Sequence, residues 1–373
     1  MAFQSRTFLV ALFISAGLVL SAPLYAATWS FFDLGVLDAS DINNAGQVVG
    51  TYSIAGDTTQ HAFITGANGV GTIDLGDLGG NISYAAGINN SGQVAGASKT
   101  SASTFQIHAF ITGANGVGIT DLGDLGGGYS VASGINNAGQ VVGTYNLPDD
   151  TAQHAFVTGA NGIGTIDLGD LGGGYSVASD INNSGKVVGY SSTVDGTYRA
   201  FITGANEVGL TELGDLGGGY STARGINDAG QVVGVSSTVD NVAQHAFITG
   251  ANGVGMTDLG TLGGKISQAI DINNLGMVVG YSQLADNFDY HAFITGPDEI
   301  GLIDLNSLVT LGGNDFLTVA TGLNDNGQIL ARSILGHSYL ITAPVPEPKT
   351  YTLMLLGLSM MGFIVFRQKA GQV

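Results

Sequence analysis

Histidine and aspartate recur at matching positions along this chain, and these are the side chains best suited to chemistry. All six histidines stand first in a short word, HAF or HSY, at His61, His108, His154, His245, His291 and His337. Acids recur in the word DLG, with a second acid three residues later, at Asp74 and Asp77, Asp121 and Asp124, and Asp167 and Asp170. Imidazoles bind transition metals and clustered carboxylates bind Ca²⁺, so both patterns raise the question of a metal site.

The repetition itself argues against a shared histidine site. Equivalent positions in successive repeats are spread around the structure, too far apart for six imidazoles to meet at one ion. One HAF-like word carries Arg199 in place of histidine. We therefore predict structural histidines that pack between neighbouring parts of the fold.

Two interpretations of the DLG acids stay open. The carboxylates and loop carbonyls on one rim are suited to Ca²⁺, although no EF-hand spacing is present. Alternatively, each aspartate accepts hydrogen bonds from the amides of a glycine-rich turn. The candidate calcium ligands are Asp74, Asp77, Asp121, Asp124, Asp167 and Asp170, and no other cofactor is predicted.

Catalytic signatures are missing from the sequence. The chain has no cysteine and therefore no thiolate nucleophile or disulfide. It has no G-x-S-x-G elbow. A glycosidase needs an asymmetric pair of carboxylates, whereas near-identical repeats supply the same acids many times. We predict no catalytic residues and a protein that is not an enzyme.

A third word, IN-N-x-G, sets the period of the chain. Its first asparagine occurs seven times, at Asn43, Asn89, Asn136, Asn182, Asn227, Asn273 and Asn324. The spacing is close to 46 residues except for a last step of 51. Seven copies of three linked words predict a repeat architecture.

Each repeat is expected to hold four strands. In the third, we predict strands at 129–135, 140–145, 154–158 and 164–168, with turns at Asn136 to Gly139 and at Asn161-Gly162. Alternation places His154, Phe156 and Thr158 on one strand face. Four strands per repeat without helices predict an all-β, seven-bladed β-propeller, with a β-solenoid as the rival.

The two half-repeats at the ends favour the closed ring. The chain enters with one strand, within Trp29 to Gly35, and leaves with a third strand, within Gly336 to Thr342. Pairing them completes a last blade from one N-terminal and three C-terminal strands, which leaves no open edge.

The three words together resemble the HAF-type extracellular repeat of secreted bacterial proteins, over Phe31 to about Ile341. This resemblance implies a propeller-like extracellular protein and carries no catalytic residues. Arg199 for histidine, Thr261 in a DLG-x-LGG word and the stretched 304–313 segment depart from the pattern.

Both ends of the chain differ from the repeats. Arg6, the apolar run from Phe8 to Leu20 and the small residues near Ala26 predict a secretory signal peptide over residues 1–26, with an uncleaved anchor as the alternative. The repeat region then covers 27–344. A final segment, 345–373, contains an apolar stretch at 350–366 that is just long enough for a membrane helix.

This final segment resembles a PEP-CTERM sorting signal. The motif is Val345, Pro346, Glu347 and Pro348, followed by the apolar span and by Arg367 and Lys369. The resemblance implies a Gram-negative envelope, transient anchorage in the inner membrane, processing by an exosortase-type enzyme, and association with exopolysaccharide. A permanent membrane anchor is the alternative.

Charge and loop composition narrow the function. The whole chain carries −19, and residues 27–345 hold six basic against 28 acidic side chains, a net charge of −22. Such a surface repels nucleic acid.

The connection between the second and third strands varies most, and its aromatics are candidate ligand contacts: Phe105, Tyr198, Phe288 and Tyr290. We predict a secreted, cell-surface or matrix protein of structural or adhesive type that binds exopolysaccharide. A polysaccharide-active enzyme and a coat protein without ligand are the alternatives.

Overall fold

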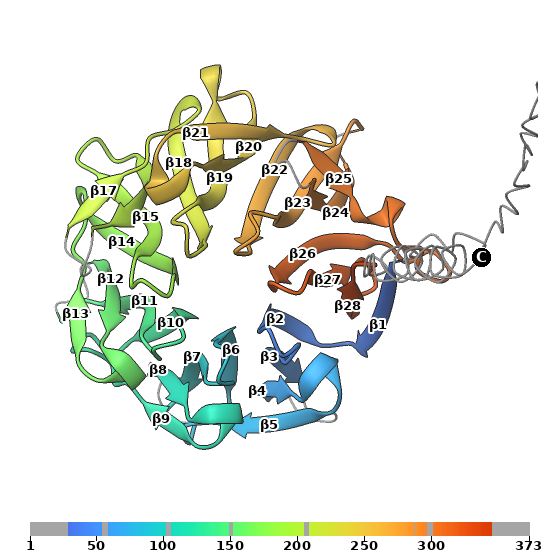
Figure 1. The fold of residues 1–373 in the computed structure, drawn as a ribbon. Helices are drawn as coiled ribbons and strands as arrows, with labels where there is room; N and C mark the ends of the chain where they lie inside the picture. The colour runs from blue at the N-terminus through green and yellow to red at the C-terminus, as the bar shows by residue number, and fades with distance from the viewer. Residues whose placement is uncertain are drawn as a thin grey trace, which may run out of the picture. The chain divides into compact units, whose positions relative to one another are not determined.

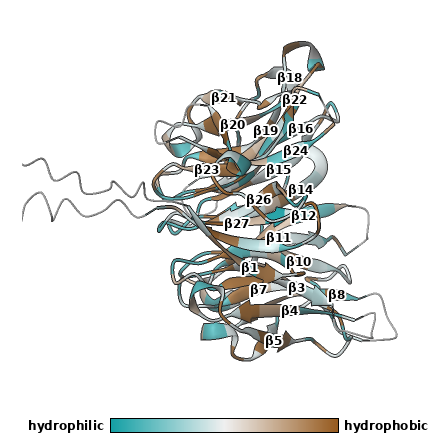
Figure 2. Cartoon of the chain, turned by 90° about the vertical axis from the view of Figure 1, so that its right-hand side faces the viewer, coloured by the Kyte–Doolittle hydropathy of each residue, from teal (hydrophilic) through white to brown (hydrophobic). Residues whose placement is uncertain are grey.

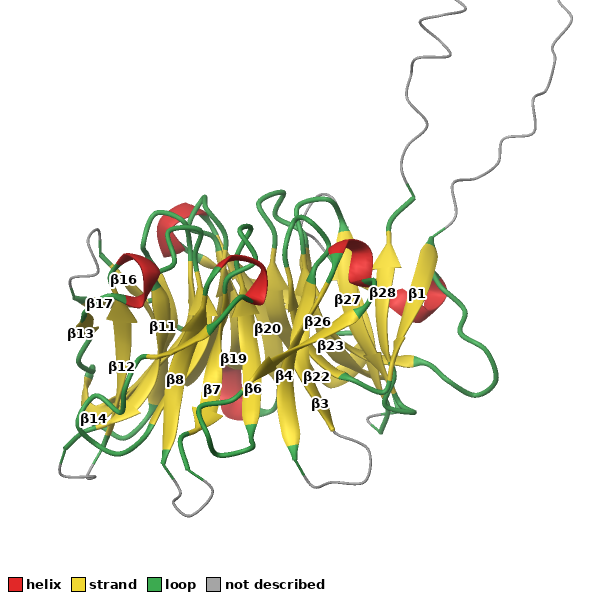
Figure 3. Cartoon of the chain, turned by 90° about the horizontal axis from the view of Figure 1, so that it is seen from below, coloured by secondary structure: helices red, strands yellow, loops and turns green. Residues whose placement is uncertain are grey.

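Short strands separated by glycine and asparagine turns make up the chain wherever its structure is described. A computed structural model describes residues 29–53, 59–101, 106–148, 152–204, 209–286, 288–296 and 301–344. The predicted signal peptide, the Val345–Pro348 motif and the 350–366 span lie outside these residues. Residues Trp29–Ala343 group together as one unit, whose regular elements are β-strands and short 3₁₀ helices (Figures 1 and 3).

Within the described residues the strands form seven antiparallel units of four strands, numbered here in chain order as sheets 1 to 7. Five are separate sheets, and sheets 5 and 6 are the two halves of one eight-stranded sheet. Sheet 1 consists of β2 (Asp38–Ile42), β3 (Val48–Ser53), β4 (Gln60–Thr65) and β5 (Thr72–Gly76). Sheet 2 consists of β6 (Ser83–Ile88), β7 (Val94–Lys99), β8 (Ile107–Thr112) and β9 (Ile119–Asp121). Sheet 3 consists of β10 (Ser130–Ile135), β11 (Val141–Asn146), β12 (Gln153–Thr158) and β13 (Thr165–Asp167). Sheets 4 and 5 are β14 (Gly172–Ile181), β15 (Val187–Thr193), β16 (Tyr198–Thr203) and β17 (Leu210–Glu212); β18 (Gly217–Ile226), β19 (Val232–Thr238), β20 (Gln244–Thr249) and β21 (Met256–Gly260). Sheets 6 and 7 are β22 (Gly263–Ile272), β23 (Val278–Leu284), β24 (Tyr290–Thr295) and β25 (Leu302–Asp304); β26 (Leu317–Leu323), β27 (Gln328–Ser333), β28 (Ser338–Thr342) and β1 (Ser30–Gly35).

Short 3₁₀ helices occupy several connections. They are η1 (Ala67–Gly69), η2 (Ala114–Gly116), η3 (Ala160–Gly162), η5 (Val239–Asn241), η6 (Ala251–Gly253) and η7 (Leu305–Ser307). Sheets 5 and 6 are also joined by one parallel pairing, Gln244 with Ile266. The all-β, four-stranded architecture predicted from the repeats is confirmed, and in sheet 3 each predicted strand end lies within two residues of the observed one.

The predicted pairing of the two chain ends is also confirmed. β1 pairs antiparallel with β28, with Phe31 opposite Ile341 and Phe32 opposite Leu340. Figure 1 shows the blue β1 beside the red β28, in the same sheet as β26 and β27. The first residues of the unit therefore complete the sheet formed by its last residues.

The core lies between neighbouring sheets. One cluster joins Ala109 and Ile111 of sheet 2 to Ile135, Val141 and Phe156 of sheet 3. Because each sheet is covered on both faces, Ala155 and Phe156 are both fully buried although they point to opposite faces. Figure 2 shows hydrophobic colouring along strands such as β4, β7 and β20.

Glycine in the second strand of a sheet is required by close backbone packing. A Cβ atom on Gly143 would lie 1.9 Å from the carbonyl oxygen of Val131 in the paired strand. The pairing of β10 with β11 shifts register between Ala132 and Gly134 at this place, which is a bulge in the ladder. The VVG word thus combines two β-branched strand formers with the one residue that this crossing tolerates.

The ring closure is testable with a disulfide, since the chain has no cysteine of its own. Ser30 and Thr342 are direct cross-strand partners in β1 and β28, at a separation that suits a disulfide. We expect the oxidised Ser30→Cys/Thr342→Cys variant to gain about 2–4 kcal/mol in unfolding free energy, because the bridge closes a loop of almost the whole ring. Denaturant titration measures this, with the reduced variant as control. Failure to oxidise would contradict the pairing.

Candidate functional site

Seven asparagines form a closed ring of hydrogen bonds around the axis of the sheets. The side-chain Nδ2 of each first-word asparagine donates to the backbone carbonyl of the equivalent asparagine in the next sheet, at 3.0–3.1 Å. The last bond, from Asn324 to the carbonyl of Asn43, returns to the first sheet. All seven asparagines are buried.

A second ring runs parallel to the first, one residue further along each turn. The backbone N–H of each member donates to the side-chain oxygen of the next at 2.9 Å. Its members are Asn44, Asn90, Asn137, Asn183, Asp228, Asn274 and Asp325. Asn274 also donates through its amide to both Asp228 and Asp325, so the two acids fit into the ring with hydrogen-bond donors around them.

Each ring asparagine also shapes its own turn. The Oδ1 of Asn136 accepts from the N–H groups of Ala138 and Gln140, both at 3.0 Å. Its Nδ2 donates to Gln140 as well as to the carbonyl of Asn182. Gly139, the last turn residue, has φ +74°, which glycine adopts without strain.

Three aspartates face the channel that these rings surround. Asp41, Asp180 and Asp271 stand two residues before the ring asparagine in sheets 1, 4 and 6, where the other four sheets have glycine. Each carboxylate accepts one N–H from its own sheet and one from the next sheet. Asp41 accepts from Ile42 at 2.7 Å and from Ile88 at 2.9 Å. The same pairs recur at Asp180 with Ile181 and Ile226, and at Asp271 with Ile272 and Leu323.

Burial raises the pKa values of all three carboxyl groups above the ordinary range. Burial, with the charge of Asp271 as the next cause, raises the pKa of Asp41 to about 8. The same two causes raise the pKa of Asp180 to about 7. For Asp271 burial alone is the main cause, and its pKa rises to about 6. The backbone N–H groups favour the charged forms, but desolvation outweighs them.

The three carboxylates separate two cavities of the central channel. A narrow mouth of about 160 Å³ is lined by the Ile-Asn turns of the seven sheets. A wide chamber of about 480 Å³ lies on the other side, lined by the first strands of all seven sheets and by Tyr190. Asp41, Asp180 and Asp271 line both cavities. The channel is therefore acidic at its middle. It is wider toward the end of the ring that carries the connections between the second and third strands, and this end is here called the loop face.

The six histidines pair with the DLG acids of the adjacent fourth strand. His61 lies 2.9 Å from Asp74, His108 2.9 Å from Asp121, and His154 3.0 Å from Asp167. The remaining pairs are His245 with Asp258, His291 with Asp304, and His337 with Asp33. The prediction of structural histidines is consistent with these contacts. Each of these ion pairs lies within one sheet, and the ring of His291 also lies 5.2 Å from that of Phe316, which directly precedes the first strand of sheet 7.

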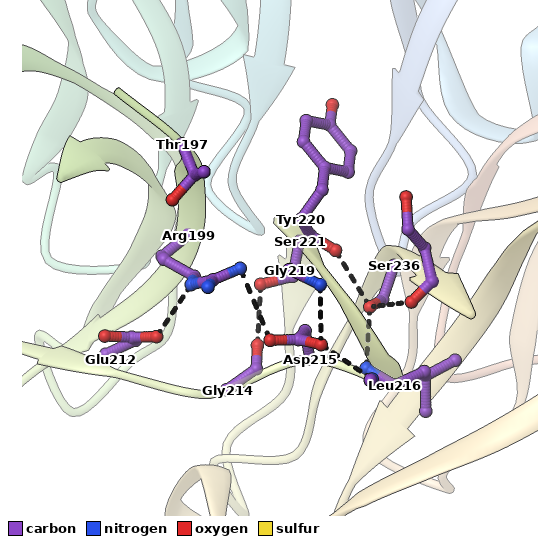
Figure 4. A network of polar contacts seen from close by, with 12 residues as sticks. Thr197, Arg199, Glu212, Gly214, Asp215, Leu216, Gly219, Tyr220, Ser221 and Ser236 are labelled. Atoms are coloured by element: carbon purple, nitrogen blue, oxygen red, sulfur yellow. Dashed lines mark hydrogen bonds and ion pairs between the residues drawn. The ribbon is translucent and has the colours of Figure 1, made fainter. Parts of the chain in front are cut away.

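The departures from the pattern preserve the same interaction. Where histidine becomes Arg199, the opposing aspartate becomes Glu212, and their side chains lie 3.0 Å apart. The second acid of that word, Asp215, lies 3.3 Å from the guanidinium (Figure 4). Where the base is arginine, the acid is the longer glutamate, and the ion pair is kept. The HAF and DLG words thus together supply one charged contact in each sheet.

The candidate calcium residues take part in these pairs and in turns. Asp74, Asp121 and Asp167 face histidines in three different sheets. Asp77 and Asp170 accept from glycine N–H groups two residues later, at 2.5 Å in each turn, and Asp124 does the same at 2.9 Å. Thr261 fills the equivalent role with a neutral hydroxyl, accepting from Gly263. Within the described ranges, no three His, Asp or Glu side chains lie close enough together to hold a metal ion.

Three of the four predicted ligand aromatics lie at the loop face, Tyr198 in sheet 4 and Phe288 and Tyr290 in sheet 6. Tyr198 begins β16 and is 37% exposed, and its ring lies 5.7 Å from that of Tyr190 and 5.8 Å from that of Tyr175. Tyr290 begins β24 and its ring lies 5.5 Å from Tyr281, while Phe288 is 85% exposed. Phe105 lies outside the described residues. The structure therefore extends the sheet 4 prediction from one tyrosine to three.

Sequence reasoning missed the channel aspartates and a set of buried serines. Ser176 accepts from the N–H of Ala155 in the previous sheet and donates to the carbonyl of Gly169, which ties sheets 3 and 4 together. Equivalent serines act in the same way elsewhere, at Ser83, Ser130, Ser221 and Ser267. The available signal was the alternation of DIN with GIN words, which marks the three sheets that carry a channel acid.

Comparison with known families identifies the C-terminal segment. Residues 344–369 match the family model described as the PEP-CTERM protein-sorting motif. The chain therefore carries a PEP-CTERM signal, as predicted, and this signal marks a protein for secretion and exosortase-type sorting. Among the described residues no helix is long and apolar enough to cross a membrane, and the predicted span at 350–366 lies outside them. The comparison with curated proteins gives no match.

Solved structures with similar folds contain β-propellers. A prolyl endopeptidase structure is 11% identical with a TM-score of 0.56, covering 86% of this chain and 51% of that one. The β-propeller domain of the trilobed protease from Pyrococcus furiosus is 8% identical with a TM-score of 0.50, covering 80% and 91%. TolB from Acinetobacter baumannii is 10% identical with a TM-score of 0.48, covering 68% and 62%. This chain thus spans about half of the endopeptidase, and at these identities the likeness concerns the propeller-like fold alone.

The channel carboxyls predict that stability falls as pH rises. Because their pKa values of about 8, 7 and 6 are above the ordinary value of 3.8, the folded state holds these protons more tightly. Their contribution is fully present below pH 3.8 and is lost as the pH rises through the folded pKa values. We expect the urea midpoint to decrease from pH 5 to pH 9, and Asp41→Asn to make this decrease shallower. Asp289→Asn, at an exposed loop position, is the control; an unchanged slope in Asp41→Asn would contradict the assignment.

The inner asparagine ring predicts a large effect from one amide. Asn136→Ala removes the acceptor for two N–H groups and the donor to Asn182 in a buried place, so we expect a loss of about 2–4 kcal/mol in unfolding free energy. Asn137→Ala, in the exposed outer ring, removes the acceptor for Asn90 and is expected to cost about 1 kcal/mol. Urea denaturation compares the two variants. Equal losses would show that the inner ring has no special role.

Proposed function

We propose that the seven sheets are the blades of a closed seven-bladed β-propeller of HAF-type repeats, which is exported and binds an extracellular polysaccharide at the cell surface. The resemblance to HAF repeats gains support because all three words have a structural role. HAF and DLG supply a charged pair within each sheet, and IN-N supplies the two asparagine rings. The PEP-CTERM signal supports export.

The observation that carries the binding proposal is the uneven distribution of aromatics between the two ends of the ring. At the end with the asparagine turns, the side chains follow one repeated pattern. At the loop face, sheet 4 carries a cluster of three tyrosines and sheet 6 carries Tyr281 and Tyr290 beside exposed Phe288. Amphipathic aromatic rings with exposed faces are suited to packing on the apolar faces of sugar rings.

Charge supports a neutral ligand over an acidic one. The repeat region has a net charge of −22, which repels phosphate and uronate polymers over the whole surface. A hydroxyl-rich neutral chain is not subject to this repulsion. We therefore place the binding surface at the tyrosines of the loop face.

A polysaccharide-active enzyme is the second candidate, on one specific observation. Asp41 and Asp180 line one chamber, and burial raises their pKa values to about 8 and about 7. A general acid in glycoside cleavage requires such a raised pKa. Against this role, each of these carboxylates is already held by two backbone N–H groups that join neighbouring sheets.

Retention on polysaccharide tests the proposal. The exported protein is applied to immobilised exopolysaccharide of its own producing organism, with Ca²⁺ and then with a chelator, and the soluble fraction is assayed for new reducing ends. We expect retention without product release, and at least a tenfold loss in Tyr198→Ala/Phe288→Ala. The control is Ile163→Ala/Val254→Ala, which removes two exposed apolar side chains at the turn end.

Each other outcome has a defined meaning. Retention abolished by chelator would assign a calcium role to the DLG acids, whereas retention indifferent to chelator would leave them as turn and ion-pair residues. Product release that disappears in Asp41→Asn would favour the enzyme. No retention in either condition would refute binding and leave a structural coat protein.

A further inference from the structure

The wide chamber of the central channel is lined by basic, aromatic and hydroxyl side chains as well as by acidic ones. Its lining combines the three carboxylates with one guanidinium, Arg224, one aromatic ring, Tyr190, and a set of small hydroxyl residues. These hydroxyl residues are Ser40, Ser133, Ser179 and Thr321. Its volume of about 480 Å³ falls within the range of small-molecule sites, roughly 300–1,000 Å³.

The hydroxyl residues and Arg224 occupy one equivalent position in the first strands. This position immediately precedes the Asp or Gly of the DIN and GIN words, and its residues line the chamber next to the carboxyl groups. It varies among sheets, with Ser179 in sheet 4, Arg224 in sheet 5 and Ile270 in sheet 6. The ring asparagine nearby is the same residue in all seven sheets. The residues that line the chamber therefore differ between sheets, whereas those of the asparagine ring do not.

The carboxylates retain hydrogen-bonding capacity toward the chamber. Each accepts two backbone N–H groups, at 2.7 and 2.9 Å for Asp41 and at 2.7 and 3.0 Å for Asp180. An ionised carboxylate has about four acceptor sites, so about two remain on each group, and the protonated form, which the raised pKa of Asp41 favours at neutral pH, offers one O–H donor beside its acceptors. A ligand rich in hydroxyl donors can fill these sites without bringing a charge into the chamber.

An aromatic wall leads from the chamber to the loop face. Tyr190 lines the chamber, and its ring lies 6.3 Å from Tyr175 and 5.7 Å from Tyr198. Tyr198 is exposed at the start of β16. The three rings are therefore continuous from the inner lining to the surface that we propose binds polysaccharide.

From this arrangement we infer that the wide chamber binds the end of a neutral saccharide chain, whose next sugar units pack along Tyr190, Tyr175 and Tyr198. This inference rests on the proposed function and assigns it a specific site. In this site the aspartate carboxyl groups accept hydrogen bonds from sugar hydroxyls, and Arg224 donates hydrogen bonds to sugar oxygens. The ring of Tyr190 packs on the face of a sugar ring. A uronate would place its charge beside three acids, which disfavours it.

Calorimetric titration of the exported full chain tests this site. The probes are cellohexaose, maltohexaose, mannohexaose and neutral fragments of the native polysaccharide, with a galacturonate hexamer and a glucosamine hexamer as charged comparators. We expect a neutral probe to bind and Tyr190→Ala to weaken it at least tenfold. Tyr190→Phe, which keeps the ring, should lose less than threefold.

Two further variants separate the site from general damage to the fold. Ser133→Phe fills the chamber from sheet 3, which neighbours the tyrosine-bearing sheet 4, and should abolish binding while thermal melting stays cooperative. Thr144→Ala is the matched control, because Thr144 has the same strand position in sheet 3 as Tyr190 has in sheet 4 and is not among the described residues that line the chamber. We expect it to change affinity by less than twofold.

The inference and the proposed function fail in distinguishable ways. If the polysaccharide is retained but Tyr190→Ala and Ser133→Phe bind the neutral probe as the unaltered protein does, the binding function stands and the chamber site is refuted. If only a charged hexamer binds, the neutral-sugar assignment is refuted. If no probe binds and no polysaccharide is retained, both are refuted.

Discussion

Closure of seven sheets around one axis is the constraint on which the rest of this structure depends. Each inner-ring asparagine donates to a carbonyl in the next sheet, and the bond from Asn324 to Asn43 completes the cycle. A buried amide without partners is costly, so every sheet must present its turn at the same height and angle. β1 reinforces this closure from the outside by pairing with β28.

The same constraint explains which residues repeat and which do not. The asparagines and the buried serines meet the backbone of a neighbouring sheet, so a change in one sheet affects the adjacent one. The glycine of VVG meets the backbone of the paired strand in its own sheet. The histidine–aspartate pair is less restricted because it lies within a sheet. It tolerates the change to Arg199 and Glu212, provided that both partners change. Function is therefore expected where contacts between sheets do not fix the side chain.

The channel acids show how a repeated fold acquires an asymmetric interior. Sheets with glycine at this position, as at Gly87 and Gly322, have no side chain there, whereas Asp41, Asp180 and Asp271 place carboxyl groups in the shared space. Burial raises the pKa values of all three, and the charge of Asp271 adds to this at Asp41 and Asp180, yet each carboxyl group also joins two sheets through backbone N–H groups. Each of these carboxyl groups both joins two sheets and lines the cavity. A change in its protonation is therefore expected to affect the stability of the ring and the binding of any ligand in the chamber.

Much of the architecture follows from the sequence alone. The period of the IN-N word, the Asn-Gly turns and the half-repeats at the ends predicted the four-stranded units, the strands of sheet 3 and the pairing of β1 with β28. These features are local or follow from counting repeats, so one sequence contains them. The PEP-CTERM motif is likewise a linear signal.

Only the tertiary structure decided how equivalent residues of different repeats meet. Periodicity gives the place of a residue within its own repeat, but it does not say which atoms face one another across the axis. It therefore could not show that Asn136 donates to the carbonyl of Asn182, or that Asp41 accepts from the N–H of Ile88. Nor could it join Tyr175 and Tyr190 to Tyr198, because that contact arises from three strands brought side by side in one sheet. The physical reason is that each of these contacts exists only after the ring has closed and the strands have paired.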